Sequence, residues 1–214
     1  MARRLLAPRT LWRANFPPVI GQTSYGVMRN HTNYRAAKDG VDNDAALDLA
    51  YELLSNEKVE QIWRSLRGTL PRVVPVHAEE LTGRNKIPMA YAKVLAEALG
   101  LTVEPQIVQS SVANHGGSPS IYHRLVSPPI FDGPVNPGTG YLIVDDTCAA
   151  GGTLANLKGF IEINGGMVLA MSVVALGRAG DPYWISLADS TLARLNIPPS
   201  RARCPLARGV WVWD

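Results

Sequence analysis

The sequence contains few cysteines and no long apolar run. Cys148 and Cys204 are its two cysteines, and they form neither a metal-ligand spacing nor a disulfide framework. No stretch approaches the ~20 apolar residues of a membrane-spanning helix. The charged start at residues 3–8 is not followed by an apolar core of signal-peptide length. We therefore expect a soluble, cytoplasmic protein with no membrane partner.

Two common phosphate-binding motifs are also missing. The turn at residues 147–153 carries adjacent glycines. A P-loop needs a lysine and then Ser or Thr after its second glycine, whereas Thr153 and Leu154 follow here. The dinucleotide-binding pattern G-x-G-x-x-G is absent from the same turn. Both motifs therefore fit this turn poorly.

The excess of positive charge is modest and scattered. The formal net charge is +3. Arginines gather near the two ends of the chain, at Arg3, Arg4, Arg9, Arg13, Arg201, Arg203 and Arg208. A nucleic-acid surface is one interpretation of these clusters, and solvated tails are the favoured one.

Helix and strand patterns alternate along most of the remaining chain. Apolar residues at helical spacing predict four helices. The first begins at Asn43, and the second begins after an N-cap at Ser55 or Asn56. The other two cover residues 86–100 and 153–165. Strands are predicted at residues 72–78, 101–111, 141–146 and 167–176. Pro75 indicates an edge position or an irregular strand end. This order predicts an α/β protein with a three-layer parallel sheet and a helical N-terminal extension.

The chain divides into three predicted regions. Residues 1–42 form a loosely structured arm that can serve as a hood over the site, and residues 43–177 form the α/β core. Residues 178–214 have no assigned role. Within the core, residues 112–140 show no period, and loops of this length are usually lids, binding loops or disordered.

The stretch YLIVDDTCAAGGTL, residues 141–154, carries the chemistry. Asp145 and Asp146 lie at the carboxyl end of a buried strand, where open parallel sheets bind ligands. The small residues that follow open a helix, whose first N–H groups and positive dipole suit a phosphate. Carboxylates accept strongly from sugar hydroxyls. The pattern suggests a site for ribose 5-phosphate, and the alternative is a pair of solvated acids before an ordinary turn.

This stretch resembles the motif by which type I phosphoribosyltransferases bind 5-phosphoribosyl 1-pyrophosphate (PRPP). The resemblance implies a phosphoribosyltransferase-like fold. It also implies that Asp145 and Asp146 are catalytic residues that hold the ribose 2- and 3-hydroxyls and contact magnesium indirectly. The 5-phosphate would be held by Ala149, Ala150, Gly151, Gly152 and Thr153.

The family holds the pyrophosphate of PRPP in the loop after the first core strand. Here that loop contains Arg84 and Lys86, and it is similar to a segment of the competence-associated phosphoribosyltransferases. The resemblance thus assigns pyrophosphate to Arg84 and Lys86. Mg²⁺ would reconcile that anion with the acids Glu79 and Glu80. A structural role is favoured for His77.

The motif also departs from the family pattern. Thr147 replaces a usually apolar residue, and Ala150 stands where a hydroxyl residue is common. Ala149 lies where the 6-oxopurine enzymes carry an aspartate, which counts against hypoxanthine or guanine as the acceptor. Adenine-type enzymes are similar in having alanine there. In the loop at 112–127, His115, His123 and Arg124 are candidates to contact pyrophosphate or base.

We therefore predict a Mg²⁺-dependent phosphoribosyltransferase that transfers the phosphoribosyl group of PRPP to a nitrogenous base. We also expect a homodimer. One alternative is a non-catalytic PRPP-sensing regulatory protein that associates with nucleic acid. Two others are a relative of the PRPP synthetases and an accessory protein of salvage or competence with weak activity.

Overall fold

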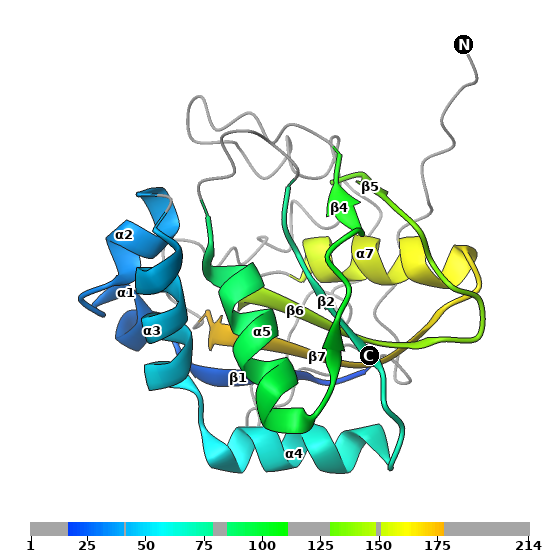
Figure 1. The fold of residues 1–214 in the computed structure, drawn as a ribbon, viewed down its shortest axis with the longest axis horizontal. Coiled ribbons are helices and arrows are strands. Elements are labelled where there is room, and N and C mark those ends of the chain that lie inside the picture. The colour runs from blue at the N-terminus through cyan, green and yellow to red at the C-terminus, as the bar shows by residue number, and fades with distance from the viewer. Residues whose placement is uncertain (1–16, 41, 79–84, 111–128, 149–150, 178–214) are drawn as a thin grey trace, which may run out of the picture.

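The computed structural model describes residues 17–40, 42–78, 85–110, 129–148 and 151–177. Its centre is a five-stranded sheet with the order β1-β7-β6-β2-β3, in which every neighbouring pair is parallel (Figure 1). The strands of this sheet are β1 (Val19–Ser24), β2 (Arg72–Pro75), β3 (Thr102–Val103), β6 (Gly140–Cys148) and β7 (Met167–Leu176). A separate antiparallel pair joins β4 (Val108–Gln109) and β5 (Phe131–Asp132).

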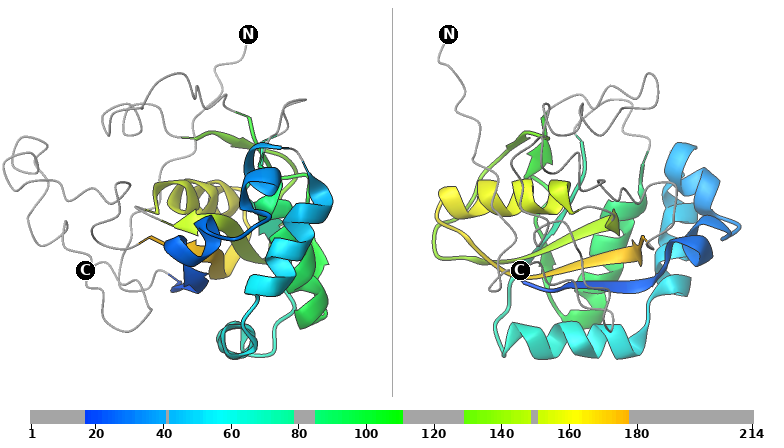
Figure 2. Two further views of the ribbon diagram at one scale, coloured as in Figure 1. Left: turned by 90° about the vertical axis from the view of Figure 1, so that its left-hand side faces the viewer. Right: turned by 180° about the vertical axis from the view of Figure 1, so that it is seen from behind.

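Helices cover both faces of the sheet. Their bounds are α1 (Tyr25–Arg29), α2 (Tyr34–Asp39), α3 (Asn43–Leu53), α4 (Asn56–Leu66), α5 (Ile87–Leu99) and α7 (Gly152–Ile163). Side chains of α3, α4 and α5 pack with Leu142 and Val144 of β6, whereas those of α7 pack with Tyr141 and Ile143. Alternate residues of a strand face opposite sides, so β6 is buried on both faces (Figure 2). The three-layer parallel-sheet architecture is confirmed.

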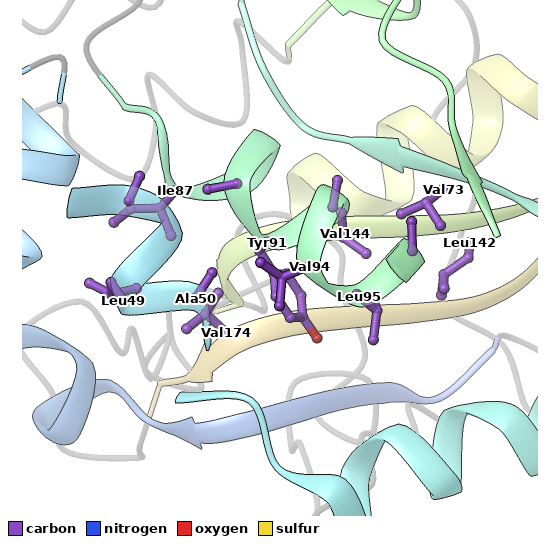
Figure 3. Packing of buried hydrophobic residues seen from close by; sticks show 14 of the residues in the cluster. Leu49, Ala50, Val73, Ile87, Tyr91, Val94, Leu95, Leu142, Val144 and Val174 are labelled. Atoms are coloured by element: carbon purple, nitrogen blue, oxygen red, sulfur yellow. The ribbon is translucent and has the colours of Figure 1, made fainter. Parts of the chain in front are cut away.

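The larger core cluster lies between α5 and the sheet. Val94 and Leu95 of α5 pack in one cluster with Leu142 and Val144, Tyr91 extends from the same helix toward β7, and α3 packs beside them (Figure 3). These side chains are at most 1% exposed. Full burial of a valine or leucine side chain contributes about 1.5–3 kcal/mol to the stability of the fold. The predicted stop of α5 at Gly100 is confirmed, because Gly100 adopts φ 64°, a left-handed conformation that glycine accepts without strain.

The prediction of a loosely structured arm is wrong for residues 17–40. This segment contains β1, α1 and α2, and β1 pairs with β7 in register from Val19 opposite Met171 to Ser24 opposite Leu176. A strand of six residues with mixed polarity has little signal of its own. Its partner lies about 150 residues away along the chain, and the pairing is therefore a tertiary effect that local patterns do not report.

Two details of the predicted strands also differ. An edge position for Pro75 is wrong because β2 lies between β6 and β3. The alternative, a strand end, is confirmed: Pro75 is the last residue of β2, and β3 pairs only with Arg72 and Val73. The single strand predicted at residues 101–111 is instead two short strands, β3 and β4. Glu104 follows β3 and accepts hydrogen bonds from Arg72 (2.7 Å) and the Gln106 amide (3.2 Å).

The structure does not describe residues 178–214 or 111–128, and the predictions made for them lie outside the described residues. Within the described part of the chain, no helix combines the length and apolar character needed to cross a membrane.

Candidate functional site

The acid pair lies on β6 just beyond the point where β2 ends. Val144 pairs with Pro75, the last residue of β2, and its carbonyl accepts from the Val76 amide at 2.8 Å. Asp145 still pairs with Val173 of β7, and β6 continues to Cys148. The pair therefore occupies the carboxyl edge of the sheet, although the strand runs two residues farther than its predicted end at Asp146. Parallel sheets bind their ligands at this edge.

The two carboxylates face different layers. Asp146 follows the alternation of Leu142 and Val144 and faces the layer that contains α5. Asp145 follows Tyr141 and Ile143 and faces the layer that contains α7. The exposed fractions are only 8% for Asp145 and 5% for Asp146. The acids are thus buried on either side of one strand end, and the alternative of solvated acids is wrong.

Asp146 is held by donors from three parts of the chain. Its Oδ2 accepts from the Lys38 ammonium in a close ion pair and from Asn85 Nδ2 at 2.8 Å. Its Oδ1 accepts from the Thr147 hydroxyl at 3.1 Å. The Asp146 backbone N–H donates to Asp145 Oδ1 at 2.8 Å, which joins the two acids. An ionised carboxylate that accepts charge-assisted hydrogen bonds is strongly fixed in orientation.

The two acids have opposite pKa shifts. Burial raises the pKa of Asp145 well above its ordinary value, and the neighbouring charge of Asp146 raises it further. Burial also acts upward on Asp146, but the charge of Lys38, with hydrogen bonds from Lys38, Asn85 and Thr147, lowers its pKa below the ordinary value. Asp146 is therefore the ionised member of the pair, and Asp145 retains a proton more readily.

Lys38 reaches the site from the N-terminal segment. Burial opposes its charge, yet Asp146 raises the pKa of Lys38 above the ordinary value, so the ammonium stays charged. Tyr34, on the same helix, is also close to Asp146: burial, a hydrogen bond with Tyr25 and the Asp146 charge all raise the Tyr34 pKa. The Lys86 amide donates to the Ala37 carbonyl at 3.0 Å and ties α2 to the start of α5.

The glycine turn lies directly before α7. Gly151 is the N-cap residue and adopts φ 65° and ψ 5°, a left-handed conformation that L residues with a side chain rarely accept. Gly152 is the first residue of α7 and Thr153 the second. The predicted turn and helix are thus confirmed at these three positions, and the first N–H groups of a helix lack intrahelical acceptors. Ala149 and Ala150 lie outside the described residues.

The predicted pyrophosphate loop is described only at its end. Arg84, Glu79 and Glu80 lie outside the described residues, as do His115, His123 and Arg124. Lys86 is the N-cap residue of α5 and follows Asn85, which contacts Asp146. His77 makes a hydrogen bond between Nε2 and the Pro105 carbonyl at 2.9 Å, as a structural role requires.

Sequence patterns did not identify Lys38 and Asn85. Asn85 lies between the two basic residues that the resemblance singled out, so its position in that loop was a usable signal. A single lysine in a segment with no visible periodicity offered none. Lys38 is near Asp146 only because β1 places α1 and α2 beside the carboxyl edge of the sheet (Figure 1).

A metal site made by the protein alone is not present in the described part of the chain, where no three His, Cys, Asp or Glu side chains form a suitable group. Mg²⁺ commonly keeps several waters and binds one or two carboxylates together with substrate phosphates. Asp145 and Asp146 fit that limited role, because each provides one carboxylate near the carboxyl end of β6.

No known family profile matches the chain. Protein TraN of Escherichia coli is 46% identical over 168 residues, which cover 78% of this chain and 37% of TraN. An uncharacterized protein of Haemophilus influenzae is 39% identical over 153 residues, which cover 72% of this chain and 34% of that protein. The chain therefore spans about a third of the length of these curated relatives.

Solved structures similar to this one include several phosphoribosyltransferases. Adenine phosphoribosyltransferase from Rhodothermus marinus has a TM-score of 0.36 and 17% identity, with 68% of this chain and 76% of that chain covered. A phosphoribosyltransferase from Corynebacterium diphtheriae has a TM-score of 0.36 and 16% identity, with 71% and 90% covered. At these values, activity has to be argued from the site itself.

Proposed function

We propose that this chain binds PRPP at the carboxyl edge of β6 and transfers its phosphoribosyl group to a nitrogenous base. One observation carries the proposal: two adjacent buried carboxylates lie near the carboxyl end of a central parallel strand, and a left-handed glycine and the first turn of α7 follow a few residues later. A buried charged acid is costly unless it is paired. Titratable groups with strongly shifted pKa values also cluster at functional sites. A ligand with both hydroxyls and a phosphate matches this arrangement.

The ribose would lie across the end of β6. Asp146, which is ionised, accepts from one hydroxyl through a charge-assisted hydrogen bond. Asp145 has a raised pKa because of burial, and in its neutral form it both donates and accepts, so it suits a second hydroxyl. The two carboxyls approach the sugar from either side of the strand and fix its orientation.

The 5-phosphate would lie at the start of α7. Gly151 and Gly152 have no side chain, so a phosphate can approach the backbone N–H groups closely. The positive end of the helix dipole favours the anion, and the Thr153 hydroxyl provides an additional donor. Asp145 faces the layer that contains α7, so its contact with the sugar would lie on the same side of the sheet as the phosphate contact.

Catalysis would depend on positioning and electrostatics. With the ribose fixed at its hydroxyls and at its phosphate, C1 would be held where a base nitrogen can attack as pyrophosphate departs, and the ionised carboxylate of Asp146 would stabilise the developing positive charge on the sugar. Mg²⁺ carried by the substrate would neutralise charge on the pyrophosphate. Dependence on Mg²⁺ and assembly into a homodimer are parts of this proposal.

Pyrophosphate release measures the proposed reaction directly. The chain is incubated with PRPP, Mg²⁺ and one base at a time, and we expect release that depends on both PRPP and the base. The Asp145→Asn/Asp146→Asn variant is the matched control, because it keeps the shape of both side chains and should release none. Release at the same rate by the double variant would remove the acid pair from the reaction.

A non-catalytic PRPP-binding protein is the second candidate. It is favoured by the three hydrogen bonds that Asp146 accepts from Lys38, Asn85 and Thr147, because these contacts fix Asp146 within the protein. This candidate predicts PRPP binding by calorimetry with no release for any base. Affinity for nucleic acid, measured at two salt concentrations, tests its association with nucleic acid, since phosphate contacts weaken steeply as salt increases.

A further inference from the structure

Asp146 already accepts hydrogen bonds on both carboxylate oxygens, and Oδ2 accepts two of them. A carboxylate offers about four lone-pair positions, and donors from Lys38, Asn85 and Thr147 already occupy three of them. A sugar hydroxyl that binds at Oδ2 has to share that oxygen with Lys38 and Asn85. A hydroxyl at Oδ2 therefore favours the departure of Lys38 or Asn85 from that oxygen.

Lys38 is the donor that can leave. Thr147 is adjacent to Asp146 in the chain, and Asn85 is fixed a second time because its Oδ1 accepts from the Ile87 amide at 3.2 Å. The Lys38 side chain is 32% exposed and its ammonium is carried by a flexible four-carbon stem. A lysine of this kind can change its partner without moving the helix that bears it.

An anion is the partner that the displaced ammonium requires. A partly buried charge without a counter-ion is costly, and α2 is tied to the start of α5 by the bond from the Lys86 amide to the Ala37 carbonyl. Lys38 and Asn85 meet at the same Asp146 oxygen. The ammonium therefore stays on the side of Asp146 nearest the start of α5.

We propose that Lys38 is a substrate-binding residue whose ammonium leaves Asp146 and contacts the pyrophosphate group of PRPP. This inference rests on the proposed function. In the structure the Lys38 ammonium pairs with Asp146. When PRPP binds, a ribose hydroxyl takes its place at the carboxylate and the ammonium contacts the pyrophosphate. Lys38 would thus select ligands that carry both a sugar and a pyrophosphate group, and it would link α2 to occupation of the site.

Two ligands distinguish this exchange from simpler roles. Binding of PRPP and of ribose 5-phosphate, which lacks the pyrophosphate, is measured by calorimetry for the unaltered chain and for Lys38→Met. We expect PRPP affinity to fall about tenfold or more, since a hydrogen bond to a charged group is lost. Ribose 5-phosphate affinity should be unchanged or tighter, because no ammonium has to leave Asp146. Lys38→Arg should retain part of the PRPP affinity.

Lys58 on α4 provides a matched control, because its side chain is 31% exposed and pairs with Glu57 at 3.5 Å. Lys58→Met should leave both affinities unchanged. If Lys38→Met does not fold, as judged by circular dichroism, Lys38→Gln replaces it because the amide can still donate to Asp146.

Each remaining outcome has a distinct meaning. Equal losses for both ligands would show that Lys38 only positions Asp146, and unchanged affinities would show that it contacts neither ligand; both overturn the exchange and leave the proposed function intact. Failure of the unaltered chain to bind PRPP would reject the proposed function, and this inference with it.

Discussion

Two buried polar clusters in this protein differ in kind. The first is neutral and lies in the core: Gln22 Nε2 donates to the Tyr91 hydroxyl at 2.7 Å, Tyr91 bonds to Ser172 Oγ at 2.6 Å, and Ser172 donates to the Ile20 carbonyl at 2.7 Å. The second is charged and lies at the sheet edge, where Asp146 pairs with Lys38.

The neutral cluster is closed. Ser172 gives its single proton to the Ile20 carbonyl, so Tyr91 has to donate to Ser172 and accept from Gln22. Tyr91 and Ser172 are 0% exposed, and every bond connects β1, β7 or α5. A satisfied network of this kind specifies how the elements pack.

The charged cluster, which also includes Asp145, is less completely buried. Its cation is 32% exposed and its two acids have opposite pKa shifts. Such an arrangement is not needed to stabilise a fold, because a buried ion pair gives little net stability compared with apolar packing. The first cluster therefore helps to position the sheet, and the second is the one at which we propose ligand binding.

The largest expected effect is loss of ligand binding at the charged cluster. Asp145→Asn/Asp146→Asn removes the Asp146 charge that accepts from one ribose hydroxyl and the Asp145 carboxyl that binds the other. One hydrogen bond to a charged group, worth about 1.5–3 kcal/mol, and one between neutral groups, worth about 0.5–1.5 kcal/mol, predict a loss of PRPP affinity of about 30-fold or more. Calorimetry measures it. Tyr91→Phe, in the neutral cluster, should leave the affinity unchanged, and an equal loss in both variants would erase the distinction.

Changes in the neutral cluster should lower the stability of the fold and not the affinity for the ligand. Tyr91→Phe leaves Gln22 and Ser172 without the hydroxyl between them, and an unsatisfied buried polar group costs about 1–3 kcal/mol in the free energy of unfolding. Urea unfolding measures this loss. Tyr51→Phe is the control, since Tyr51 is 52% exposed, and it should change stability by less than about 0.5 kcal/mol.

Two glycines with the same backbone conformation allow an effect on stability to be distinguished from an effect on ligand binding. Gly151 has φ 65° before α7, and Gly100 has φ 64° after α5. Alanine at either position should cost about 1–2 kcal/mol in stability because the left-handed conformation disfavours a Cβ. Only Gly151→Ala should also weaken binding of ribose 5-phosphate. Equal affinities for the two variants would mean that the turn before α7 does not hold the phosphate.

The smallest effects concern pH. A raised pKa makes Asp145 contribute stability that is present below its ordinary value of 3.8 and lost as pH increases through the raised value. Asp145→Asn should therefore gain stability relative to the unaltered chain as pH rises. The lowered pKa of Asp146 acts oppositely: its contribution is present above 3.8 and lost as pH falls through the lowered value.

Urea unfolding of the two single variants across this pH range tests the asymmetry. Asp146→Asn should be less stable than the unaltered chain near neutral pH, and the deficit should shrink only below pH 3.8. The same pH trend for both variants would contradict the assignment of Asp146 as the ionised acid.

The sequence predicted the parts of the fold that have strong local patterns. β6 and β7 are buried runs and α5 is a long amphipathic helix with a glycine stop, so each is recognisable without its neighbours. The acid pair and the turn at 151–153 were predicted for the same reason. The motif is contiguous, and its position at a strand end fixes its place in the sheet.

The missed features depend on distant contacts. β1 is a strand because β7 pairs with it, and Lys38 belongs to the site because β1 positions α2 beside β6. Neither dependence leaves a local pattern in residues 17–40. The same argument explains Pro75, since its tolerance in an internal strand follows from the shortness of β3.

A crystal structure of the chain with ribose 5-phosphate tests the central claim most directly. We predict the sugar hydroxyls at Asp145 and Asp146 and the phosphate at the amides of Gly151–Thr153. Ribose 5-phosphate bound at any other surface, with Lys38 still paired to Asp146, would contradict the account.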